Sequence, residues 1–113
     1  MQLVNLTPHP ITLLAPDNEH VIAPEPTPAR CAVRTEQVGT IAGLPVVRQA
    51  FGELVGLPEP KADTRYIVSV VAQQAACRAG RHDCLTVADL VRDSEGRVIG
   101  ARALGVCCER ATL

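Results

Sequence analysis

Aromatic residues are almost absent from this sequence, which has one phenylalanine, one tyrosine and no tryptophan among 113 residues. Proteins that bind single-stranded nucleic acid usually stack the bases on aromatic rings. The shortage therefore argues against recognition of RNA or single-stranded DNA. A net charge of -1 likewise gives no overall field that would draw the protein to phosphate backbones or to an anionic membrane.

Long apolar segments are also missing. No stretch reaches the roughly 18–20 apolar residues that a membrane-spanning helix needs, and residues 1–5 lack the basic and apolar regions of a signal peptide. The five cysteines are an odd number and include the adjacent pair Cys107 and Cys108, which does not fit a disulfide framework in a chain of this size. We therefore expect a cytoplasmic protein with reduced cysteines and no membrane partner.

The chain does contain enough apolar material for a core. Hydrophobic residues make up 47% of it and charged residues 20%, a balance typical of folded proteins and not of disordered ones. The length suits one domain. We expect a single domain over residues 1–113, with a β-rich part at 1–60, a strand–helix–strand–hairpin part at 61–113, and a hinge in the loop at 57–63.

The first sixty residues have a β pattern, because their apolar residues come in short runs between prolines and turn residues. A turn expected at Ala42 and Gly43 predicts that the two longest runs form a hairpin. The predicted strands are residues 3–6, 11–15, 20–23, 32–40 and 44–51.

One helix is predicted over residues 70–79. Ser69 can cap its N-terminus, and Gly80 can adopt the left-handed conformation that ends a helix. We expect a narrow face of small residues, from Val71 to Ala76, to pack on the sheet, with Gln73 pointing mostly away from it. Strands at 65–68 and 84–87 and a hairpin around 93–96 complete an α+β fold, a mostly antiparallel β-sheet with one principal helix packed on it.

The helix N-terminus is a candidate anion site, because free N–H groups and the helix dipole favour negative charge there. Residues 61–113 hold eight basic side chains against six acidic ones. Arg65, Arg81 and Arg92 could therefore surround an anion at Ser69. The alternative is that Ser69 only caps the helix, and the glycine-rich loop of a nucleotide cradle is absent.

A polar cluster follows the first strand. Asn5, Thr7 and His9 alternate with prolines that stiffen the backbone. They could form the rim of a small-molecule site. They could equally be a turn whose side chains satisfy local backbone groups.

The cysteines and histidines suggest two further chemistries. Cys77, His82 and Cys84, with Cys31 or Cys107 and Cys108, could be drawn as a zinc site, but their spacing lacks the short C-x₂₋₄-C unit of structural zinc sites, and buried reduced cysteines explain them as well. Cys84 could form a thiol–imidazole pair with His82 or His9, but no third, orienting group is evident. We predict no metal, no cofactor and no catalytic residue.

Several segments together resemble a family of small, functionally uncharacterised proteins of bacteriophages, prophages and actinobacteria. The resemblance spans nearly the whole chain. It implies a phage-linked setting and no particular activity. The segments are Asn5-Leu6-Thr7-Pro8-His9, residues 52–58, Tyr66-Ile67-Val68-Ser69 with Val71-Ala72, Arg81-His82-Asp83, and residues 91–93 and 96–100.

These observations lead to one hypothesis and two alternatives. The hypothesis is a small non-catalytic protein that sequesters a small anionic or nucleotide-like ligand, in a phage setting a signal used in host defence. The first alternative is a thiol- or zinc-dependent hydrolase. The second is a structural or protein-interaction module in which an exposed strand edge pairs with a second copy to form a homodimer.

Overall fold

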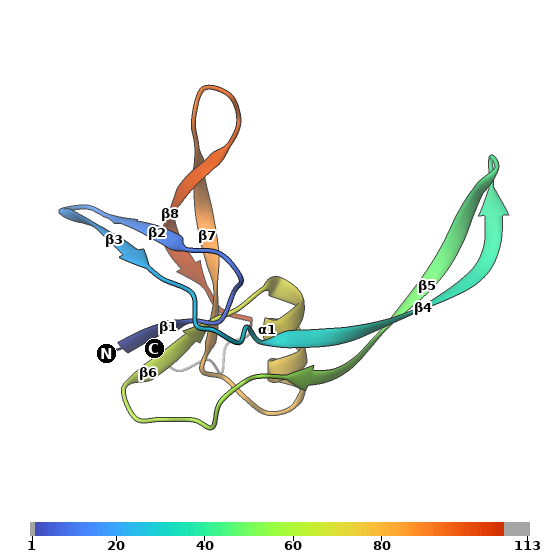
Figure 1. The fold of residues 1–113 in the computed structure, drawn as a ribbon, viewed down its shortest axis with the longest axis horizontal. Coiled ribbons are helices and arrows are strands. Elements are labelled where there is room, and N and C mark those ends of the chain that lie inside the picture. The colour runs from blue at the N-terminus through green and yellow to red at the C-terminus, as the bar shows by residue number, and fades with distance from the viewer. Residues whose placement is uncertain (1, 108–113) are drawn as a thin grey trace.

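The computed structural model describes residues 2–107, which form eight strands and one helix (Figure 1). A β-rich chain with a single helix was predicted and is confirmed. None of the described residues belongs to a helix with the length and apolar character needed to cross a membrane. In chain order the elements are β1 (Gln2–Asn5), β2 (Ile11–Ala15), β3 (Asn18–Ile22), β4 (Arg30–Ile41), β5 (Leu44–Val55), β6 (Thr64–Ile67), α1 (Val70–Arg78), β7 (Cys84–Arg92) and β8 (Val98–Gly105).

Six strands form one mixed sheet in the order β1-β6-β7-β8-β2-β3. The β2–β3 and β7–β8 pairs are antiparallel hairpins, whereas β1–β6, β6–β7 and β2–β8 are parallel. The prediction of a mostly antiparallel sheet was therefore wrong for the main sheet, because three of its pairings join strands that are not consecutive hairpin partners. The parallel pair β6–β7 arises because α1 carries the chain back across the sheet, as a parallel connection requires. Since β1 pairs with β6, the segments 1–60 and 61–113 share one sheet.

The two edges of this sheet nearly close on each other. A parallel bridge links Asn5, at the end of β1, to Pro24, just after β3. The backbone N–H of Glu25 donates to the carbonyl oxygen of Asn5 at 2.9 Å. The edge groups at the end of β1 are thereby paired, which limits edge-to-edge association at this point.

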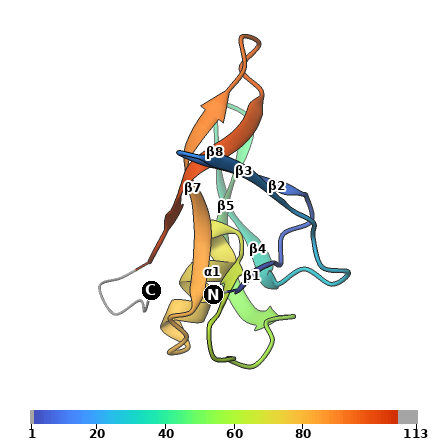
Figure 2. The same ribbon diagram turned by 90° about the vertical axis from the view of Figure 1, so that its left-hand side faces the viewer.

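The helix α1 begins at Val70, as the sequence predicted, and ends at Arg78, one residue before the predicted end. The hydroxyl of Ser69 accepts from the backbone N–H of Ala72 at 3.2 Å, and Gly80 has a φ of +89° just after the helix. Figure 2 shows α1 beside β7. The helix contributes Ala72 and Ala76 to a core that also contains Leu6, Tyr66, Val68 and Cys84.

The predicted helix face needs one correction. Gln73 does not point away from the sheet but is buried, with 5% of its surface exposed. Its Nε2 donates to the carbonyl oxygens of Cys84 at 3.1 Å and Gly105 at 2.9 Å. An amide can be buried here because two strand carbonyls satisfy it.

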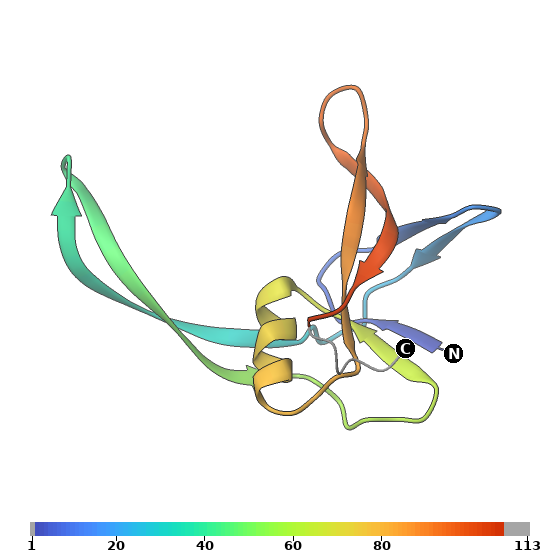
Figure 3. The same ribbon diagram turned by 180° about the vertical axis from the view of Figure 1, so that it is seen from behind.

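The β4–β5 hairpin forms a separate two-stranded sheet, which we call the arm, and it projects far from the rest of the molecule (Figures 1 and 3). The predicted turn is confirmed, because Ala42 and Gly43 both have positive φ values, 53° and 80°, as a two-residue turn of this type requires. The Cα radius of gyration is 16.3 Å, against about 13 Å for a compact domain of this length. The arm accounts for this extended shape.

The base of the arm is fixed to the body, by which we mean the six-stranded sheet and α1. Leu54 packs against the core, and Ala29, just before β4, is part of it. At Gly56 the backbone has a φ of +92°, and a Cβ atom would lie 2.8 Å from the carbonyl oxygen of Pro28. Only glycine fits this close crossing without strain.

Candidate functional site

The four residues predicted to bind an anion lie in three separate places. Ser69 caps the N-terminus of α1, while Arg65 and Arg81 lie towards the opposite end of the helix. A nine-residue helix is about 13 Å long, so these groups do not meet around one ion. Arg92 ends β7, and its Nη1 donates to the carbonyl oxygen of Gly96 within the turn that follows.

Arg65 and Arg81 do share a shallow hollow, and Lys61 and His82 also border it. Its volume is about 310 Å³. We call this the basic hollow. Sequence reasoning did not include Lys61 or His82, because nothing local links residues 61 and 82 before the sheet is formed.

One carboxylate borders the basic hollow and is already paired. Arg81 donates from Nε and Nη2 to the two oxygens of Asp83 at 3.1 and 2.9 Å, and from Nη2 to the carbonyl oxygen of Pro58 at 2.8 Å. The hydrogen bond to Asp83 is the main reason that the pKa of Arg81 is raised. Burial opposes ionisation of Asp83, but the hydrogen bond and charge of Arg81 outweigh it and lower the pKa of that carboxyl.

Asn5, Thr7 and His9 form a local hydrogen-bonded turn. Asn5 is fully buried; its Nδ2 donates to the carbonyl oxygens of His9 at 2.8 Å and Ile22 at 3.0 Å, and its Oδ1 accepts from the backbone N–H and hydroxyl of Thr7. This geometry gives Asn5 and Thr7 the structural role that was the alternative to a ligand rim. Their participation in ligand binding stays a prediction.

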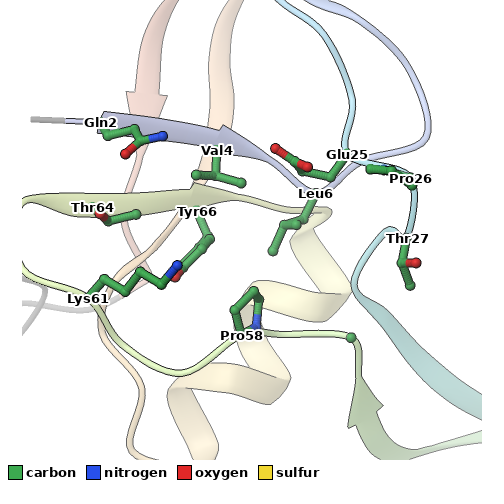
Figure 4. Close-up of a pocket in the computed structure, with 11 residues that line it drawn as sticks. Gln2, Val4, Leu6, Glu25, Pro26, Thr27, Pro58, Lys61, Thr64 and Tyr66 are labelled. Atoms are coloured by element: carbon green, nitrogen blue, oxygen red, sulfur yellow. The ribbon is translucent and has the colours of Figure 1, made fainter.

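A second hollow, of about 420 Å³, lies between β1, β6 and the loops beside them (Figure 4). Val4, Leu6 and Tyr66 provide its apolar part. Tyr66 is turned inward, and its hydroxyl donates to the carbonyl oxygen of Glu59 at 3.0 Å. Sequence reasoning missed this hollow, whose polar margin consists of Gln2, Glu25, Thr27, Lys61 and Thr64.

Three potential metal ligands meet near the end of α1. The Sγ atoms of Cys77 and Cys107 and a ring nitrogen of His82 all lie within 4.8 Å of one another, and all three residues are half-buried. The sequence spacing had argued against a metal here. Spacing was a poor guide because Cys107 reaches the cluster through the pairing of β8 with β7. Cys108, also considered as a ligand, lies outside the described residues.

Cys84 does not form the thiol–imidazole pair considered for catalysis. Its Sγ lies 4.0 Å from Oδ1 of Asp83, whereas it is Cys77 that lies 4.0 Å from Nδ1 of His82. Burial, with a smaller effect from the charge of Asp83, raises the pKa of Cys84 to about 11. A thiol with this pKa is overwhelmingly protonated at neutral pH and is a weak nucleophile.

The arm has one apolar and one charged face. Residues directly opposite each other on paired strands lie on the same face, and successive residues alternate. The pairs Val33–Phe51, Thr35–Gln49 and Gln37–Val47 lie on one face. We call it the apolar face of the arm after its two valines and its phenylalanine, which flank the polar pair Thr35–Gln49. The intervening pairs, Arg34–Ala50 and Glu36–Arg48, lie on the other.

No family model, curated protein or solved structure matches this chain. The resemblance to small phage-linked proteins therefore stays a prediction. The chain's function has to be argued from its own geometry.

Proposed function

We propose that this protein is a small non-catalytic binding module that joins further copies of itself through the apolar face of the arm. One observation carries this proposal. Val33, Phe51 and Val47 share that face and are 50%, 45% and 43% exposed. A sheet with one apolar face normally covers that face with another element, and an isolated two-stranded hairpin is marginally stable in water.

The surface area of the chain supports an oligomer. The chain exposes 7813 Å², whereas a compact monomer of 12.0 kDa exposes about 6,000 Å². The difference of about 1,800 Å² lies within the roughly 1,000–2,500 Å² that each partner contributes to an obligate homodimer. Contact with another copy through the apolar face of the arm would bury part of this surplus.

A second copy is the occupant we favour because the apolar face is self-complementary. Two arms stacked face to face would each cover the valines and phenylalanine of the other, in the way that the two sheets of a sandwich pack. The opposite face, with Arg34, Glu36 and Arg48, would stay in water. A two-fold axis between the arms gives each copy the same contacts.

The test compares two neighbouring positions on opposite faces of β5. Phe51→Ser removes the largest apolar side chain of the apolar face, and Ala50→Ser changes a small residue on the charged face. Light scattering over a range of protein concentrations should show a dimer or larger oligomer for the natural protein and for Ala50→Ser. Phe51→Ser should weaken association about tenfold or more. A natural protein that stays monomeric at high concentration would refute the proposal.

A second function, capture of a small anionic or nucleotide-like ligand, is favoured by the basic hollow. Lys61, Arg65 and Arg81 border one hollow, and the carboxylate beside it, that of Asp83, is already paired with Arg81. Arginine forks suit phosphate and carboxylate oxygens. The setting suggested by the resemblance, in which a phage-linked protein removes a nucleotide-like defence signal, would need such a site.

Thermal-shift measurements with inorganic phosphate and with linear and cyclic nucleotides test this second function. Ligand should raise the melting temperature in a concentration-dependent way. Arg65→Ala should abolish the shift, while the control Arg102→Ala, an exposed residue on β8, should keep it. Mass spectrometry should recover the ligand unchanged. Turnover of the ligand would favour a hydrolase, and equal shifts in both variants would remove Arg65 from the site.

A further inference from the structure

We infer that Cys77, His82 and Cys107 together bind one zinc ion. Their three donor atoms lie within 4.8 Å of one another. The inference does not depend on the arm or on anion binding, although His82 also borders the basic hollow.

Three different parts of the fold bring these ligands together. Cys77 lies in the last turn of α1, His82 follows the end of that helix, and Cys107 follows β8. Gln73 positions the third ligand. It lies one helical turn before Cys77, hence on the same side of the helix, and its amide holds the carbonyl oxygen of Gly105 at 2.9 Å. The chain leaving β8 is thereby held against the end of α1.

The distances suit a tetrahedral ion. With Zn–S bonds of about 2.3 Å and Zn–N bonds of about 2.0 Å, ligand atoms around zinc lie about 3.5–3.8 Å apart. Cys77 Sγ and His82 Nδ1 are 4.0 Å apart, and the full set lies within 4.8 Å. Small rotations of the side chains would therefore complete the site, without movement of the strands or helix.

The chemistry of the donors selects the metal. Two thiolates and an imidazole are soft or borderline ligands, which favour zinc over magnesium or calcium. The half-buried setting limits competition from water, and the neighbouring carboxylate of Asp83 is held by Arg81. Three protein ligands leave a fourth position for a water molecule or another donor. The ion would join the end of α1 to the chain after β8, so its binding energy would add to folding energy.

The experiment measures metal content in the full-length protein purified with reductant and supplied with zinc. Native mass spectrometry should find one zinc per chain, which a chelator removes with a fall in melting temperature. Cobalt in place of zinc should give the visible absorption of a tetrahedral ion and a thiolate-to-cobalt charge-transfer band. Cys77→Ser, His82→Gln and Cys107→Ser should each weaken zinc binding about tenfold or more. Cys31→Ser is the matched control, because Cys31 lies in the arm, and it should bind zinc normally.

Three results would overturn the inference. Absence of zinc would do so directly. Full zinc binding by both Cys77→Ser and His82→Gln would show that Cys107 and its neighbour Cys108 suffice as a metal-binding pair. A natural protein lighter by two hydrogens under mild oxidation, and unable to bind zinc when reduced, would indicate a disulfide instead.

Should a variant fail to fold, alkylation of the natural protein gives the same answer. Zinc should protect Cys77 and Cys107 from iodoacetamide, and chelation should expose them. The reactivity of Cys31 should not change. Equal labelling of Cys77 and Cys107 with and without zinc would contradict the site.

Discussion

The body and the arm use similar aliphatic residues in opposite ways. In the body, Ile67 is completely buried, whereas in the arm Ile41 is 70% exposed beside the turn. Both residues lie in β-strands. The comparison teaches that the apolar residues of a segment indicate that its side chains are to be buried. Within one chain, the fold buries them only in the body.

The largest expected effect on the free energy of unfolding comes from replacing isoleucine by alanine in the body, and the same substitution in the arm is its comparison. Ile67→Ala should lower the free energy of unfolding by about 2–5 kcal/mol, because it leaves a cavity in a packed core. Ile41→Ala should change it by less than about 0.5 kcal/mol in dilute protein, as at other exposed positions. Urea denaturation measures both. Similar losses for the two variants would mean that the arm is packed as tightly as the body.

Asn5→Ala should have the next largest effect. The substitution removes hydrogen bonds to the carbonyl oxygens of His9 and Ile22 and to Thr7. At about 1–3 kcal/mol for each polar group left unsatisfied, we expect a loss of about 2–4 kcal/mol. The control Asn18→Ala, at an exposed position on β3, should cost less than about 0.5 kcal/mol. Thermal denaturation that ranks Asn18 above Asn5 would contradict the structural role of this turn.

The third prediction concerns charge. Because the folded pKa of Asp83 lies below its unfolded value, its ion pair with Arg81 stabilises the protein fully above that unfolded value, near pH 4. This stabilisation is lost as the pH falls through the folded pKa. Asp83→Asn should lower the free energy of unfolding by about 1.5–3 kcal/mol at neutral pH. The stability of this variant should also fall less steeply as the pH is lowered.

The arm provides the comparison for this ion pair. Glu36 and Arg48 are cross-strand neighbours on its charged face, in full contact with water. Glu36→Gln should change stability by less than about 0.5 kcal/mol. Urea denaturation between pH 3 and pH 7 measures both variants. An unchanged acid profile in Asp83→Asn would show that another carboxyl controls acid stability.

The smallest expected effect is a gain in the stability of the arm. Ala42 has a φ of 53°, a conformation that costs a residue with a Cβ about 1–2 kcal/mol and that asparagine tolerates better. Ala42→Asn should therefore stabilise the arm by about 0.5–1 kcal/mol. Hydrogen exchange should become slower at Val38 and Val47 and should stay unchanged in β6. The control Ala50→Asn, inside β5, should make exchange in the arm faster, because asparagine is disfavoured in strands.

Much of the secondary structure could be predicted, because the signals are local. The serine cap and the terminal glycine fixed both ends of α1, and Ala42-Gly43 fixed the turn of the arm. The strands at the end of the chain were predicted too short. Asp89 has a φ of 48° within β7, and an aspartate there obscures the alternation of apolar residues on which strand prediction depends.

The candidate sites were less predictable, because they combine residues from distant segments. The structure does not bring Arg65, Arg81 and Arg92 together around Ser69. Arg65 lies near the start of β6 and Ser69 after its end, α1 separates Ser69 from Arg81, and Arg92 lies at the far end of β7. Conversely, the spacing of Cys77, His82 and Cys84 argued against a metal site, yet the pairing of β7 with β8 brings Cys107 beside Cys77 and His82 at the end of α1.

The sequence by itself determined where the helix and most turns occur, which residues are apolar or polar, and that the chain folds largely as strands. Only the tertiary structure decided the mixed order of the sheet, the burial of Gln73, the meeting of two thiols with an imidazole, and the exposure of the arm. The physical reason is the distance along the chain over which each interaction acts. Caps, turns and alternation act over a few residues, whereas neighbours across a sheet are chosen by the sum of many long-range contacts.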